Sequence, residues 1–220
     1  MNPNEVIDRI DKRMSELPVR DTQSIRRVRR EFSKEIRNAA APDVLKLGLE
    51  LLARGDFIHR FIAYELVAAH AEALESLTTK TLEQFGAGLD SWETVDTFGL
   101  YLGGPAWREQ QVPDSAIKGW ARSKDRWRRR AALVATVPLN SKARGGRGDT
   151  PRTLMICAML VEDHDDMVEK ALSWALRELA KRDPKSTRQF LREHEALLGA
   201  RVLREVRNKL ETGLKNPRSR

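Results

Sequence analysis

Four residues have the side-chain types and sequence positions that could form one chemical site. Trp92 and Asp96 stand four residues apart in SWETVD, so a helix would place them on one edge. Arg130 lies in RWRRRAAL, and Trp174 lies in EKALSWALRELAK. Indole rings attract cations through their faces, and a fixed carboxylate stabilises positive charge that develops in a reaction. These residue types favour a concave site for a cationic, nucleic-acid-like ligand.

The helical pattern around Trp174 sets it apart from the core. At 100° per residue it lies far from the apolar stripe of its helix, on the same side as three basic residues. The stripe consists of Val168, Leu172, Ala175, Leu176 and Leu179, and the basic neighbours are Lys170, Arg177 and Lys181. An exposed tryptophan on a basic face indicates contact with a ligand or partner, and packing between repeats is the alternative.

Asp96 and Arg130 also need an explanation beyond packing. Asp96 lies inside its helix, because Asp90 or Ser91 is placed to cap it, and the alternative to a site is a surface pair with a nearby arginine. Arg130 falls within an apolar arc that includes Trp127, whose own role we interpret as structural. An arginine there needs an anion, either a carboxylate such as Asp96 or a bound phosphate.

The elements that must position these residues are helices. Apolar residues recur at helical spacing nearly end to end, and no segment alternates as a strand would. Thr22 is placed to cap one helix, a second ends at Gly55, and a third covers residues 56–77. Further helices are predicted to begin near Asp90, Asp114, Asp125, Thr150, Asp165, Pro184 and Gly199. The predicted fold class is therefore all-α.

A weak internal repeat suggests how these helices are arranged. Arg130-Ala131-Ala132-Leu133 and Lys170-Ala171-Leu172 open comparable segments 40 residues apart. That period, with two helices per unit, is typical of HEAT or armadillo repeats. We expect an α-α superhelix (solenoid) of about six helix pairs, forming a single domain over residues 1–213, followed by a disordered basic tail over residues 214–220.

Positive charge is concentrated in one region. The chain carries a formal charge of +8, whereas the stretch from Lys118 to Arg152 alone carries +9. Such a region predicts a polyanionic partner, and a solvated surface is the alternative. Within it, the Arg/Gly loop NSKARGGRGDT (140–150) lacks an apolar anchor, so we expect a flexible segment that either contacts phosphates or is a surface insertion. The candidate DNA-binding residues are Lys118, Arg122, Lys124, Arg126, Arg128, Arg129, Lys142, Arg144, Arg147, Lys170, Arg177 and Lys181.

Other classes of chemistry lack their motifs. The sequence has no HExxH, CxxC, GxSxG, P-loop or dinucleotide fingerprint, so we expect neither a metal nor a cofactor. The single Cys157 lies in LMICAML and is expected to be a buried thiol. No apolar run approaches the ~20 residues of a membrane span, and the first residues lack a signal-peptide core. We expect a cytoplasmic, nucleoid-associated monomer.

The motifs SWETVD, DRWRRRAAL and MVEKALSWALRELAKRDP, in this order and spacing, resemble those of the DNA alkylation repair family, the AlkD-like DNA glycosylases built from HEAT-like repeats. The resemblance covers roughly residues 20–210, and GARVLREVRNKL is similar to the last helix of the family. Two departures stand out. Ser91 occupies a position that often holds a second tryptophan, and the loop over residues 140–150 is longer than usual.

The resemblance implies a DNA glycosylase that excises N3- and N7-alkylated purines from double-stranded DNA in base excision repair, without base flipping. The matching active-site positions are Trp92, Asp96, Arg130 and Trp174. Asp96 would stabilise the developing sugar cation and position water, the two tryptophans would attract positive charge, and Arg130 would hold a backbone phosphate. Two alternatives remain: a non-catalytic HEAT-repeat protein that binds DNA structures through the same basic groove, and a protein-interaction scaffold.

Overall fold

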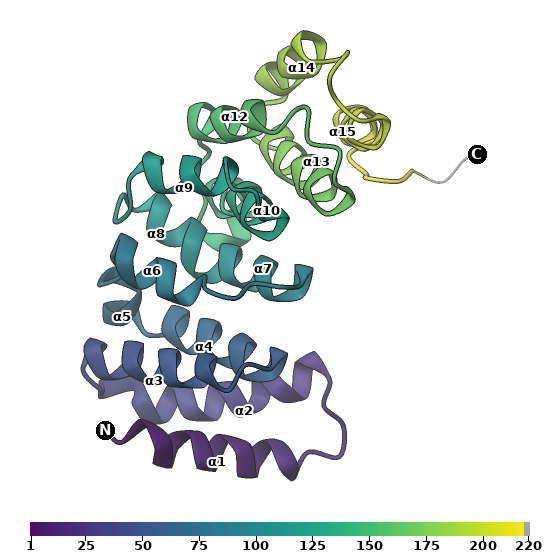
Figure 1. Cartoon of the computed structure of the whole chain (residues 1–220). Coiled ribbons are helices and arrows are strands. Elements are labelled where there is room, and N and C mark those ends of the chain that lie inside the picture. The colour runs from purple at the N-terminus through teal and green to yellow at the C-terminus, as the bar shows by residue number, and fades with distance from the viewer. Residues whose placement is uncertain (218–220) are drawn as a thin grey trace. The chain divides into compact units, whose positions relative to one another are not determined.

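The described part of the chain, residues 1–217 of a computed structural model, contains helices and no strand, which confirms the predicted all-α class (Figure 1). Packing divides it into two units, residues 1–88 and the residues from Leu89 onward. Within each unit, helices that are neighbours in sequence pack in pairs, as in an α-α solenoid. The prediction of a disordered tail falls partly on residues 218–220, which lie outside the described residues.

The first unit contains six α-helices and one short 3₁₀ turn. They are α1 (Pro3–Ser15), α2 (Thr22–Glu35), η1 (Ile36–Asn38), α3 (Ala41–Ala53), α4 (Phe57–Ala69), α5 (Ala71–Glu75) and α6 (Thr79–Phe85). Two sequence predictions in this unit are wrong in detail. Asp21, rather than Thr22, caps α2, because its carboxylate accepts from the Ser24 amide at 2.8 Å.

The second correction concerns the helix predicted over residues 56–77, which is broken at His70. The backbone of His70 is extended, and its Nδ1 accepts from the Ala73 amide at 3.2 Å, so this side chain caps α5. Its Nε2 lies 3.1 Å from the Ala39 carbonyl, which ties the break to the neighbouring helix. Because histidine is not among the usual capping residues, the sequence pattern did not reveal the break.

The second unit contains the helices that carry the candidate site. They are α7 (Trp92–Phe98), η2 (Gly99–Gly103), α8 (Gly104–Arg108), α9 (Asp114–Ala121), α10 (Arg126–Val134), α11 (Val137–Asn140), η3 (Lys142–Arg144), α12 (Thr150–Met159), α13 (Asp166–Ala180), α14 (Pro184–Glu193) and α15 (Ala200–Thr212). Within this unit, α10 packs on α7 and on α13, and α13 packs on α15. Figure 1 shows these four helices along one side of the unit, with α8, α9 and α12 along the other and α14 at its end.

The close approach of α7 to α10 depends on a glycine. α7 continues into η2, a π-helical turn, and then into α8. Gly99 opens this turn, and a Cβ atom there would lie 2.8 Å from Val134 Cγ1 of α10. The core face predicted for this segment, which includes Val95, Phe98 and Leu102, is buried. The missing side chain of Gly99 therefore allows α7 to place Asp96, three residues earlier, against α10.

Candidate functional site

A cavity of about 610 Å³ in the second unit is lined by all four candidate residues. Trp92 and Asp96 come from α7, Arg130 from α10 and Trp174 from α13. The structure thus brings together side chains that lie up to 82 positions apart in the sequence. The juxtaposition follows from the packing of α10 between α7 and α13.

Arg130 links three parts of this cavity. Its side chain is only 6% exposed, and it donates from Nε to Asp96 Oδ1 at 2.9 Å and from Nη2 to Oδ2 at 2.8 Å. Nη1 donates to the Met167 carbonyl at 2.5 Å, at the start of α13. Of the two anions that the sequence allowed for Arg130, the structure supplies the carboxylate. A phosphate contact by Arg130 stays a prediction of the resemblance.

Asp96 is a partly buried carboxylate with a matched partner. Burial raises the pKa of its carboxyl above the ordinary value, and the hydrogen bonds from Arg130 act in the opposite direction. Each carboxylate oxygen accepts one bond from Arg130 and keeps a further lone-pair site. The 15% exposed side chain lines the cavity, so this remaining capacity is available to a ligand that carries positive charge or donates a hydrogen bond.

The two tryptophans differ in exposure. Trp92 is 49% exposed, so a large part of its indole is open to solvent. Trp174 is half-buried, and the apolar stripe predicted for its helix is buried, so the helix directs Trp174 away from its own core. Both indoles line the same cavity as Asp96. The arrangement can therefore offer aromatic surfaces and negative charge to one cationic group.

The rim of the cavity carries several cations, some of which sequence reasoning missed. Lys170 and Arg177 were among the predicted DNA-binding residues and do line the cavity. Arg201, Glu205 and Lys215 also line it. Glu205 could have been found from the sequence, because it lies between Val202 and Val206 on the apolar side of α15. A buried carboxylate there is costly unless it has a partner.

The remaining predicted DNA-binding residues do not line the cavity among the described residues. Arg126 pairs with Asp165 at 3.5 Å and lies over the Trp127 ring, and Arg129 pairs with Asp163 at 2.5 Å. Lys181 pairs with Glu178 at 2.5 Å. The others outside the cavity are Lys118, Arg122, Lys124, Arg128, Lys142, Arg144 and Arg147.

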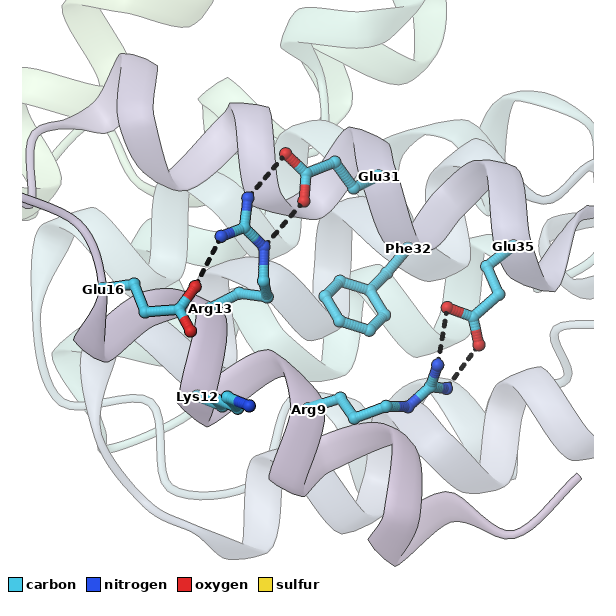
Figure 2. A pocket seen from close by; sticks show the side chains of 7 residues that line it. All are labelled: Arg9, Lys12, Arg13, Glu16, Glu31, Phe32 and Glu35. Carbon is cyan, nitrogen blue, oxygen red and sulfur yellow. Dashed lines mark hydrogen bonds and ion pairs between the residues drawn. The ribbon is translucent and has the colours of Figure 1, made fainter.

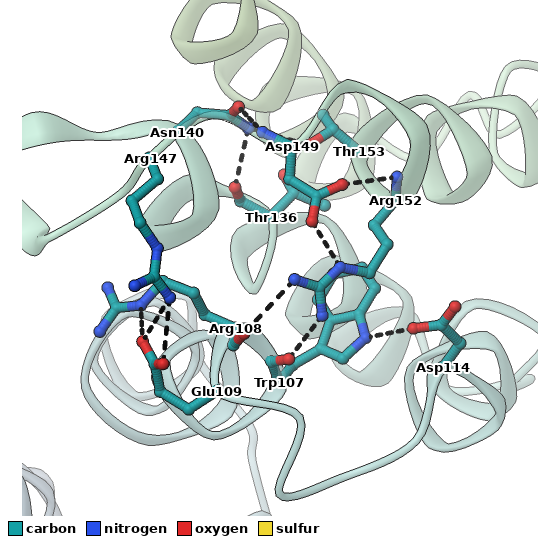
Figure 3. A network of polar contacts seen from close by, with 10 residues as sticks. All are labelled: Trp107, Arg108, Glu109, Asp114, Thr136, Asn140, Arg147, Asp149, Arg152 and Thr153. Carbon is teal, nitrogen blue, oxygen red and sulfur yellow. Dashed lines mark hydrogen bonds and ion pairs between the residues drawn. The ribbon is translucent and has the colours of Figure 1, made fainter.

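The Arg/Gly loop over residues 140–150 is held by polar anchors in place of the apolar ones that it lacks (Figure 3). Asn140 is buried and donates to the Thr136 carbonyl and to Thr153 Oγ1, and its Oδ1 accepts from the Asp149 amide at 3.1 Å. Arg182 donates to the carbonyls of Asn140 and Gly146. The loop has no apolar anchor, as expected, and its backbone is bound instead by Arg182 from the turn after α13.

A second cavity, between α1 and α2 of the first unit, is lined mainly by charged side chains that pair with one another (Figure 2). Arg9 pairs with Glu35, and Arg13 pairs with Glu31 and Glu16. Phe32 lies between the two sets of ion pairs. The side chains that line this cavity carry three positive and three negative charges, whereas those that line the cavity around Asp96 carry five positive and two negative charges.

The described residues contain no cluster of three or more histidine, cysteine, aspartate or glutamate side chains suited to a metal ion. They also include no helix with the length and hydropathy that would be needed to cross a membrane.

Comparison with known proteins gives one family. A family model described as DNA alkylation repair enzyme matches residues 19–210. Neither the curated proteins nor the solved structures include a significant match to the chain. All residues of the cavity described above except Lys215 fall within the matched range.

Proposed function

Because the chain belongs to the DNA alkylation repair enzyme family, we propose that it is a DNA glycosylase that removes cationic N3- and N7-alkylated purines from duplex DNA. Membership supports a role in the repair of alkylated DNA. The glycosylase activity itself is proposed from one observation: Asp96, held by two hydrogen bonds from Arg130, lines the same cavity as Trp92 and Trp174.

The charge of the lesion suits such a cavity. Alkylation at N3 or N7 makes the purine cationic, so its bond to the deoxyribose weakens and the departing base needs no general acid. Each indole face contributes ~0.5–2 kcal/mol of attraction to a nearby cation. Trp92 and Trp174 would thus favour the charged lesion over an ordinary purine, and the half-exposed Trp92 would lose its contact with water in the complex.

Asp96 would act at the sugar. When the bond between C1′ and the purine nitrogen breaks, its electron pair neutralises the base and leaves positive charge on the deoxyribose. A carboxylate stabilises that charge and can orient water towards C1′. The ion pair with Arg130 keeps the carboxylate in place, since both of its oxygens are engaged in a bidentate arrangement.

The cationic rim would contribute to binding of the DNA backbone. Four cations line the cavity besides Arg130: Lys170 and Arg201 pair with Asp166 of α13, and Arg177 and Lys215 face Glu205. Contacts of this kind with phosphates bind DNA of any sequence and weaken as salt rises. The proposal does not require the base to enter a deep pocket, because flipping costs a few kcal/mol that an already labile bond makes unnecessary.

The test is incubation of the protein with a duplex that contains one N7-methylguanine, followed by quantification of the released base. We expect release of 7-methylguanine and none from the unmodified duplex. An Asp96→Asn variant serves as the matched control for contaminating activities. DNA binding without release by the unmodified protein would contradict the proposal and favour a non-catalytic protein that binds DNA through the same cavity.

A further inference from the structure

The segment that follows α15 contributes to the cavity, although it lies beyond the residues matched by the family model. Gly213 adopts a left-handed conformation, with φ of +76°, and reverses the chain after the helix. Asn208 then donates to the Lys215 carbonyl at 3.1 Å, and Lys209 donates to the Gly213 carbonyl. These contacts bring the Lys215 side chain to the rim of the cavity.

Lys215 meets a buried carboxylate there. Glu205 of α15 is 5% exposed, and its Oε2 accepts a hydrogen bond from Ser173 Oγ at 2.6 Å. Its Oε1 lies 3.4 Å from Lys215 Nζ, and Oε2 lies 3.8 Å from Arg177 Nε. One carboxylate therefore faces two cations from two other segments, and the cluster keeps one unit of positive charge.

Arg177 keeps hydrogen-bond donors that the cluster does not use. Its side chain is 17% exposed, and burial lowers the pKa of its guanidinium, whereas Glu205 and Glu178 act to raise it. Nε donates to Ser173 Oγ at 3.2 Å, so the guanidinium is anchored on one side only. Among the described residues, none accepts a hydrogen bond from its Nη1 or Nη2 atoms. A half-buried guanidinium in this position is stabilised by a further anion.

We propose that Arg177 and Lys215 form a subsite for one phosphodiester of the DNA beside the alkylated nucleotide. Glu205 and Ser173 are its positioning residues, because they hold the Nε side of Arg177 and draw Lys215 to the rim. A phosphodiester carries one negative charge, which balances the excess charge of the cluster. The planar guanidinium can also donate two parallel hydrogen bonds to a phosphate.

The position of this subsite connects it to the proposed reaction. Arg177 is three residues after Trp174, so both side chains occupy one face of α13, and both line the cavity. A phosphate held there would fix the distance between the DNA backbone and the indole. The inference rests on the proposed function in one respect, which is that the neighbouring nucleotide is alkylated. The phosphate contact itself does not require that the protein excise a base.

The test uses a duplex with a tetrahydrofuran abasic analogue, in which each phosphate near the analogue is replaced in turn by a neutral methylphosphonate. For the unmodified protein, we expect the replacement of one of these phosphates to weaken binding roughly ten-fold, which corresponds to the loss of one charge-assisted hydrogen bond. In Arg177→Ala and Lys215→Ala, binding to the ordinary duplex should fall, and the methylphosphonate at that linkage should weaken binding less than it does for the unmodified protein, because only one of the two cations remains.

Arg204→Ala is the matched control, because Arg204 is an exposed cation of α15 that does not line the cavity. It should keep the full penalty at the sensitive linkage. Glu205→Gln should reduce that penalty if Glu205 positions Lys215, and Lys215→Ala, an exposed substitution, keeps the test open should Glu205→Gln unfold. An undiminished penalty in both Arg177→Ala and Lys215→Ala would overturn the subsite. If the two variants lose the penalty but the unmodified protein releases no alkylated base, the phosphate subsite stands and only the proposed glycosylase activity is contradicted.

Discussion

Replacing Asp96 with asparagine should reduce the release of alkylated purine by 10²–10³-fold. The substitution keeps the size and polarity of the side chain but removes the negative charge that the sugar cation would meet. At a separation of about 4 Å and an effective dielectric constant of about 20, suited to a 15% exposed side chain, one such attraction amounts to ~4 kcal/mol. The opposing charge of Arg130 reduces this attraction, and a loss of rate of 10²–10³-fold corresponds to ~2.7–4 kcal/mol, so we expect the loss to fall towards the lower end of that range.

The same substitution has a cost for the fold that the structure makes explicit. Arg130 is nearly buried, and in the variant its only carboxylate partner among the described residues becomes a neutral amide. Removing one member of a buried ion pair costs ~3–5 kcal/mol, and the amide oxygen together with the Met167 carbonyl should reduce that cost. We therefore expect a lower free energy of unfolding, by a few kcal/mol, alongside the loss of rate.

Single-turnover excision of N7-methylguanine, DNA affinity and thermal unfolding should be measured on the same preparation, at a temperature where the variant is folded. Glu93→Gln is the matched control, because it removes one carboxylate from α7 at a position that does not line the cavity. It should keep nearly full activity. Wild-type rates in a folded Asp96→Asn protein would refute the reasoning, as would an equal loss of rate in Glu93→Gln.

Three further predictions follow from the geometry. Since burial raises the pKa of Asp96, excision should decline on acidification at a pH above that expected from the ordinary value of 3.8, and a pH–rate profile of Asp96→Asn should lack this decline. Lys142, Arg144 and Arg147 lie outside the cavity, but replacing all three with alanine should weaken DNA binding. The slope of log affinity against log salt should also fall by up to ~0.9 per lost contact, which fluorescence titrations at several salt concentrations would measure. Gly104→Ala should lower the unfolding temperature, because its Cβ would lie 2.7 Å from the Ala135 carbonyl oxygen, whereas Gly119→Ala, with nothing within 4 Å, should raise it slightly.

The sequence predicted the fold class because helical periodicity is a local signal. It also predicted that Trp92, Asp96, Arg130 and Trp174 lie in one concave patch, and in the structure all four line one cavity. Among the described residues of the second unit, helical spacing located seven of nine α-helix starts to within two residues, including those at Asp114, Thr150 and Pro184, and missed α8 and α11. It also separated Trp174 from the apolar stripe of its helix, and the structure places that indole in the cavity. Side chains that break an amphipathic pattern are informative in this way because burial without a partner is costly.

Features that depend on tertiary contacts were missed. The break at His70 uses a side-chain cap whose other ring nitrogen meets a carbonyl from a different helix, and the anchoring of the Arg/Gly loop uses arginines up to 42 residues away. Lys215 reaches the cavity only because Gly213 reverses the chain. The groups that these side chains meet are decided by packing between helices, which local sequence patterns do not reveal.

The three donors of Arg130 have a mechanical consequence. One side chain binds a carboxylate on α7 and a backbone carbonyl at the start of α13, so it sets the distance between the helices that carry Asp96 and Trp174. Widening that gap would separate a buried charge from its partner, which is costly. We therefore expect these walls to stay nearly rigid when DNA binds. The DNA duplex would then have to change its shape on binding, so the protein should bind easily deformed sequences and lesions faster than stiff ones.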